Sequence, residues 1–145
     1  MSYPIKFHPT QGGVLEAVGQ WDVFENTTDT SPHTWFHIGE TMYFEYTWKQ
    51  KGWYFDPPPQ NENWKLHIYF EKIGLGQTNT PPEDIATVAV TAGDPLTYPP
   101  VRYAVPTTGM AEGTYRVTAA IQLHGATKPR PFGGFTEGAM IYLFP

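Results

Sequence analysis

Apolar and polar residues alternate with a period of two along much of the chain, and no segment of useful length shows a helical period. The clearest case is GTYRVTAAIQLHG, 113–125, in which every second residue from Tyr115 to Leu123 is apolar. The segments 39–52 and 64–74 alternate in the same way. Because successive side chains of a strand point to opposite faces of a sheet, this pattern predicts half-buried β-strands.

Shorter segments bounded by Gly, Pro or Asn add to this set, because such residues end strands and form turns. The additional strands are expected at 3–9, 19–26, 85–93, 100–106 and 138–145. The stretches 27–31 and 76–84 are expected to be loops. About eight strands without a linker or an internal repeat predict a single domain, residues 1–145, built as a sandwich or a barrel.

The amino-acid composition supports an all-β class and argues against several functions. The 145 residues include 15 Pro, 14 Gly and 16% aromatic residues, as in many short strands joined by turns. A net charge of −5 with scattered Lys and Arg argues against nucleic acid as a partner. No stretch approaches the ~20 apolar residues of a membrane span, and no Sec-type signal is seen, so a cytoplasmic location is the default expectation.

No catalytic constellation is recognisable. The chain has no Cys, its only serines are Ser2 and Ser31, and it has no G-x-S-x-G motif. On a strand, His33 and His37 would lie about 13 Å apart, too far to share one metal ion. The carboxylates Asp56 and Glu62 fall in a loop, where solvated side chains are expected. We therefore predict no catalytic residue, no metal site and no cofactor, and favour a non-enzymatic role.

The segment MAEGTYRV, 110–117, resembles the turn into the penultimate strand of immunoglobulin-like and fibronectin type III domains. The resemblance implies that the Tyr115 hydroxyl bonds back to the preceding corner. FHIGETMYFEYTW, 36–48, is similar to the beginning of the second strand of that fold, and Trp64 would be the core tryptophan of the third. The fold class implied is an immunoglobulin-like antiparallel β-sandwich.

The stretch KGWYFDPPPQNENW, 51–64, is the first candidate binding site. Its three prolines stiffen the loop, and a stiff loop presents aromatic rings at a small entropic cost. Trp53, Tyr54 and Phe55 are therefore candidate ligand-binding residues, although they could equally fold back as a lid over the end of the sandwich. Other aromatic residues on the alternating segments are expected in the core: Phe44, Trp48, Trp64 and Phe70.

The second candidate site is GATKPRPFGGFTEG, 125–138, which is expected to be the last hairpin loop. It contributes Arg130, Phe132 and Phe135 as candidate ligand-binding residues. The Arg130-Pro131-Phe132 sequence resembles the last-loop motif of chagasin-like cysteine-peptidase inhibitors, which implies peptidase inhibition through this loop.

Three functions remain open. The leading hypothesis is a binding or assembly module that contacts a protein or a glycan through these two loops. The alternatives are a peptidase inhibitor and a small β-barrel with a ligand pocket or an unrecognised catalytic site. A homo-oligomer is also expected, since several apolar residues should lie on outer sheet faces: Tyr43, Tyr69, Met140, Tyr142 and Phe144.

Overall fold

The computed structural model describes residues 2–74 and 83–145, and every strand in this part lies in one sheet. The strands are β1 (Tyr3–His8), β2 (Glu16–Phe24), β3 (Trp35–His37), β4 (Thr41–Lys51), β5 (Asn63–Ile73), β6 (Glu83–Ala89), β7 (Leu96–Pro106), β8 (Gly113–His124) and β9 (Pro129–Phe144). A short 3-10 turn, η1 (Trp53–Phe55), follows β4. The described chain is all-β, as predicted.

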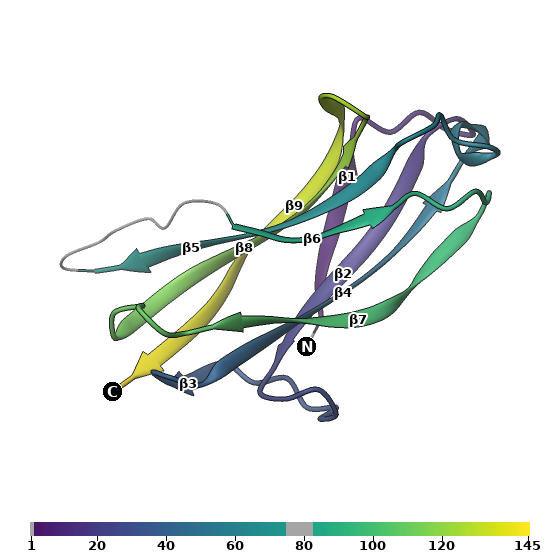
Figure 1. The fold of residues 1–145 in the computed structure, drawn as a ribbon. Coiled ribbons are helices and arrows are strands. Elements are labelled where there is room, and N and C mark those ends of the chain that lie inside the picture. The colour runs from purple at the N-terminus through teal and green to yellow at the C-terminus, as the bar shows by residue number, and fades with distance from the viewer. Residues whose placement is uncertain (1, 75–82) are drawn as a thin grey trace.

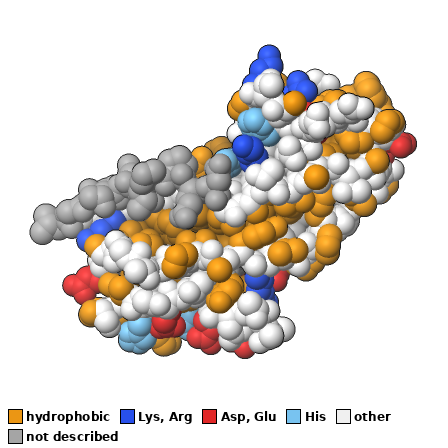
Figure 2. Space-filling model, in the orientation of Figure 1, with side chains coloured by type: hydrophobic (Ala, Val, Ile, Leu, Met, Phe, Trp, Pro, Cys, Tyr) orange, Lys and Arg blue, Asp and Glu red, His pale blue; other side chains and the backbone are white. Residues whose placement is uncertain are grey.

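The sheet follows the order β6-β5-β8-β9-β1-β2-β4-β7 and bends over itself into two layers (Figure 1). One layer contains β5, β6, β8 and β9, and the other contains β2, β4 and β7. Strand β1 joins them, since it pairs with β9 on one side and with β2 on the other. Because the path ends at β6 and β7, the sheet is an open sandwich and not a closed barrel. Hydrophobic side chains form a band along the open side between these two end strands (Figure 2).

All eight predicted strands are present, and the largest differences from the prediction lie in two regions. The first is β3, a three-residue strand that pairs in parallel with the end of β9. The second is the start of β9 at Pro129, which leaves only 125–128 as the last loop. The sequence GG, 133–134, resembles a turn, but a Cβ on Gly134 would lie 2.5 Å from the Lys6 carbonyl oxygen. Gly134 therefore allows close approach of β1 to β9, and a Cβ on Gly133 would lie 3.0 Å from the Ile121 carbonyl oxygen of β8.

The expected loop at 76–84 lies outside the described residues as far as 82, and its last two residues begin β6. The other predicted loop, 27–31, contains no strand.

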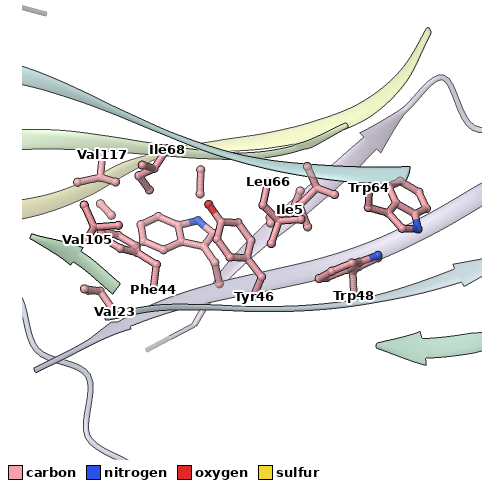
Figure 3. Packing of buried hydrophobic residues seen from close by; sticks show 14 of the residues in the cluster. Ile5, Val23, Phe44, Tyr46, Trp48, Trp64, Leu66, Ile68, Val105 and Val117 are labelled. Atoms are coloured by element: carbon pink, nitrogen blue, oxygen red, sulfur yellow. The ribbon is translucent and has the colours of Figure 1, made fainter. Parts of the chain in front are cut away.

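The inward side chains of the two layers fill the space between them. Figure 3 shows Phe44, Tyr46 and Trp48 pointing from β4 toward the opposite layer. The Trp48 and Trp64 ring centroids lie 6.3 Å apart in an edge-to-face arrangement, which aromatic pairs prefer. The four aromatic residues predicted for the core are all buried, so that prediction is confirmed: Phe44, Trp48, Trp64 and Phe70.

The corner before β8 also has the bond expected from the sequence. The Tyr115 hydroxyl donates a hydrogen bond of 2.6 Å to the Ala111 carbonyl oxygen. The ring is buried, and burial raises the pKa of the Tyr115 hydroxyl. This bond fixes the turn that leads from β7 into β8.

Candidate binding surface at one end of the sandwich

Four connections meet at one end of the molecule: β1–β2, β4–β5, β6–β7 and β8–β9 (Figure 1). Lys, Arg and His side chains gather at the tip formed by the β8–β9 connection (Figure 2). The aromatic stretch 53–55 belongs to the same end, because it lies in the β4–β5 connection. The two sequence-predicted loops are therefore neighbours in space.

The turn η1 is attached to the β1–β2 connection by its backbone. The Trp53 N–H donates to the Gly13 carbonyl oxygen at 3.1 Å, and the Tyr54 N–H donates to the Val14 carbonyl oxygen at 3.0 Å. Gly52, with φ of 117°, allows this approach, since a Cβ there would lie 2.1 Å from the Val14 oxygen. Only glycine combines that backbone angle with so close a contact.

The β6–β7 connection holds η1 from the other side. The Gly93 N–H donates to the Phe55 carbonyl oxygen at 2.8 Å. The Asp94 Oδ1 atom accepts a hydrogen bond of 2.7 Å from the Gly52 N–H. With bonds to two neighbouring connections, η1 is fixed before any ligand arrives, which lowers the entropic cost of binding.

The three aromatic residues of η1 point to three environments. Trp53 is 64% exposed, whereas Phe55 is fully buried with its ring centroid 5.9 Å from that of Trp64. Tyr54 is intermediate and packs against the core. The sequence did not decide which of the three rings faces solvent, and in the structure it is the Trp53 ring. Phe55 supports the surface from beneath and is not available to a ligand.

Beside Tyr54 lies a buried carboxylate that sequence reasoning placed in solvent. Glu62 is only 3% exposed, and both of its carboxylate oxygens accept a hydrogen bond of 3.2 Å from Arg130 Nε. The Tyr54 hydroxyl donates to Glu62 Oε1. Burial, followed by this hydrogen bond, raises the pKa of Tyr54 to about 12. The prediction of a solvated Glu62 was therefore wrong: the carboxylate is enclosed, and Arg130 compensates its charge.

The remaining candidate residues all belong to β9, but their side chains lie in different environments. Arg130 is half-buried against Glu62, and Phe132 lies in the core, stacked on Phe7 at 5.6 Å between centroids. Phe135 is 64% exposed, but it lies in the middle of the sheet, where Lys6 of β1 is its partner. The structure thus brings Trp53, Tyr54 and Arg130 together at the end, places Phe135 elsewhere and buries Phe132 as a core residue.

A buried polar network, which the sequence reasoning missed, supports this end from within. The fully buried Gln50 donates from Nε2 to the carbonyl oxygens of Thr91 at 2.6 Å and Gly93 at 3.0 Å. Its Oε1 atom accepts from the Tyr98 hydroxyl at 2.6 Å and from Trp64 Nε1 at 3.3 Å. The sequence did contain a signal for its burial. Every second residue of β4 points inward, and Gln50 lies two residues after the buried Trp48. A fully bonded buried network fixes the elements that it joins.

The polar groups beside Trp53 are paired with one another. The Glu62 charge is compensated by Arg130, and the Tyr54 hydroxyl, with its pKa raised to about 12, donates to Glu62. Among residues 2–74 and 83–145, no three His, Cys, Asp or Glu side chains are grouped so as to hold a metal ion. His33 and His37 instead contact the Trp35 ring, with centroids at 4.7 and 5.9 Å. In the same part of the chain, no helix has the length and apolar character needed to cross a membrane.

Comparison of the chain with protein-family models, with curated proteins and with solved structures gives no match.

Proposed function

We propose that the sandwich is immunoglobulin-like. In that fold the second strand pairs with the fifth, the third with the sixth, and the sixth with the seventh. With β4 taken as the second strand, the pairs β4–β7, β5–β8 and β8–β9 follow this scheme. The Tyr115 corner bond and the buried Trp64 on β5 give independent support.

We further propose that the protein is a non-enzymatic binding module whose contact surface is the end that carries η1. The observation behind this proposal is the exposed Trp53 indole on a turn held by two neighbouring connections. Tryptophan offers a large apolar area with few rotatable bonds and dominates many binding hot spots. Trp53 is the anchor, Arg130 and Tyr54 are its polar neighbours, and the ligand is a protein or a glycan.

A pair of matched tryptophan variants tests this function. Trp35 is a suitable control because it is 50% exposed and lies in β3, at the opposite end of the molecule. A ligand is first identified by affinity capture and on a glycan array, and its affinity for each variant is then measured by calorimetry. Trp53→Ala should weaken binding about tenfold or more, and Trp35→Ala should leave it unchanged. Equal affinity of Trp53→Ala and the wild type would exclude this surface.

Peptidase inhibition has less support. Phe132 of the chagasin-like motif is buried, and Arg130 is bonded to Glu62. Both residues lie in strand β9, whereas inhibition would require them in an accessible loop. Titration of papain-like enzymes with micromolar protein tests this alternative directly, and a lack of inhibition eliminates it.

The barrel alternative does not fit the described fold. The sheet ends at β6 and β7, so it does not close. Core side chains from both layers also fill the space in which an internal ligand would bind. A ligand site in this protein is expected on a surface.

A further inference from the structure

A shallow depression of about 450 Å³ lies on the outer face of the layer that contains β5, β8 and β9. Its floor contains the small side chains of Thr118 and Ala120 on β8. Tyr69 is the β5 partner of Thr118, and Phe135 is the β9 partner of Ala120. The two rings therefore stand diagonally across β8, on the strands that flank it.

Both rings are accessible: Phe135 is 64% exposed and Tyr69 is 37% exposed. Neighbouring strands are about 4.8 Å apart, so the strands that carry the rings are about 10 Å apart. The small floor residues between them leave room for a ligand that presents an apolar face to a ring. Such rings give contact area at a low cost in side-chain entropy.

One end of the depression is polar. Arg116 and Glu71 face each other across β8 and β5, with Arg116 Nη1 at 4.0 Å from Glu71 Oε2. Both side chains are more than one third exposed. The guanidinium offers N–H donors, and the carboxylate offers oxygen acceptors. Because the two charges are opposite, the pair can bond hydroxyl groups without requiring a charged ligand.

The location of the depression argues against an extended peptide as the ligand. A peptide that adds a strand needs a sheet edge with unpaired backbone groups. The depression is instead centred on β8, whose residues Arg116, Thr118 and Ala120 are paired with β5 on one side and with β9 on the other. Recognition must therefore come from side chains.

We propose that this depression is a binding site for a neutral saccharide. The apolar faces of its sugar rings pack on Phe135 and Tyr69, and its hydroxyl groups bond with Arg116, Glu71 and Thr118. The site is separate from the Trp53 surface and does not depend on the function proposed for that end.

The test uses the full chain and a defined panel of neutral oligosaccharides from β-1,4-glucan, β-1,3-glucan, xylan and mannan. Binding is measured by calorimetry for the wild type and for Phe135→Ala, Tyr69→Ala and Trp53→Ala. Val101→Ala is the control, because Val101 is an exposed apolar residue on β7, in the other layer, that does not line the depression. NMR shifts of the Thr118 and Ala120 amides report where the sugar binds.

At least one saccharide should bind, shift both amides and bind about tenfold more weakly to Phe135→Ala and Tyr69→Ala. Val101→Ala should behave as the wild type. The proposal is overturned if no oligosaccharide of the panel binds, or if binding survives both ring substitutions. If only Trp53→Ala abolishes saccharide binding, the sugar belongs to the end surface, which supports the proposed function and rejects this site.

Discussion

The Glu62 carboxylate is enclosed at the end of the sandwich, and it has one bonding partner nearby in the chain and one far away. Tyr54 precedes it by eight residues, and Arg130 follows it by 68. A buried carboxylate is costly unless a charge and hydrogen bonds compensate it. The Arg130 side chain therefore has a structural role in addition to any contact with a ligand.

Arg130→Met should leave the Glu62 charge unpaired and reduce the free energy of unfolding by roughly 2 to 4 kcal/mol. In the double variant Arg130→Met/Glu62→Gln the buried charge is absent, so the loss should be smaller. Lys128→Met, in the exposed neighbouring turn, is the control and should change stability by less than about 0.5 kcal/mol. Urea denaturation measures all three. Similar losses for Arg130→Met and Lys128→Met would contradict the role given to the ion pair.

Tyr54→Phe gives a prediction about pH. The variant lacks the hydroxyl that bonds Glu62, so it should be less stable than the wild type by about 1 to 3 kcal/mol at neutral pH. The Tyr54 pKa is about 12 in the folded protein and near 10 when unfolded, so the unfolded state loses its proton first. Wild-type stability should therefore fall relative to Tyr54→Phe between about pH 10 and 12. Denaturation midpoints across this range should converge, and a constant difference would disprove the assigned pKa.

At the scale of elements, β1 determines how the two layers are joined. It pairs with β2 in one layer and with β9 in the other. The contact with β9 requires Gly134, because a Cβ there would meet the Lys6 carbonyl oxygen at 2.5 Å and Ile5 Cγ2 at 2.8 Å. The glycine thus acts through packing, and no turn is formed at this position.

Gly134→Ala should push β1 away from β9 and lower stability by about 1 to 3 kcal/mol. Gly12→Ala is the matched control, since a Cβ on Gly12 meets nothing within 4 Å. Thermal denaturation measures stability, and hydrogen exchange should show faster exchange of the β1 amides in Gly134→Ala alone. Equal exchange in both variants would mean that β1 accommodates the methyl group.

At the scale of the whole molecule, the exposed aromatic residues lie in separate regions. Trp53 is at one end, Phe135 and Tyr69 lie on the face of one layer, and Tyr142 and Phe144 lie at the far end of β9. At that far end, Phe144 has its ring centroid 6.4 Å from that of Trp35. Of the residues expected to form one outer apolar face, Tyr43 lies in the other layer, on β4.

Self-association remains a prediction from the sequence, and the exposed pair Tyr142 and Phe144 is where it should occur, because exposed apolar patches favour burial. Sedimentation should show a dimer whose population rises with concentration. The double variant Tyr142→Ser/Phe144→Ser should shift the population to monomer. Val18→Ser, at an exposed apolar position on β2, should not. A wild type that stays monomeric at several hundred micromolar would contradict the prediction.

Alternation and turn-forming residues along the chain by themselves determined the all-β class, the presence of the eight longer strands and the central core residues. These features are local, because a period of two assigns each side chain to a face without knowledge of its partners. The Tyr115 corner bond was equally accessible, since its acceptor lies only four residues away. The aromatic content of 51–64 marked a candidate surface, in which the structure exposes Trp53.

Only the tertiary structure decided which rings are exposed and which polar residues are buried. Trp53 and Phe55 are two residues apart, yet one faces solvent and the other the core, because η1 is placed by bonds to the β1–β2 and β6–β7 connections. Glu62 is buried because folding brings Arg130 to it from β9. Contacts between distant segments leave no periodic signal in the sequence, so the fold class could be inferred from the sequence while the composition of the site could not.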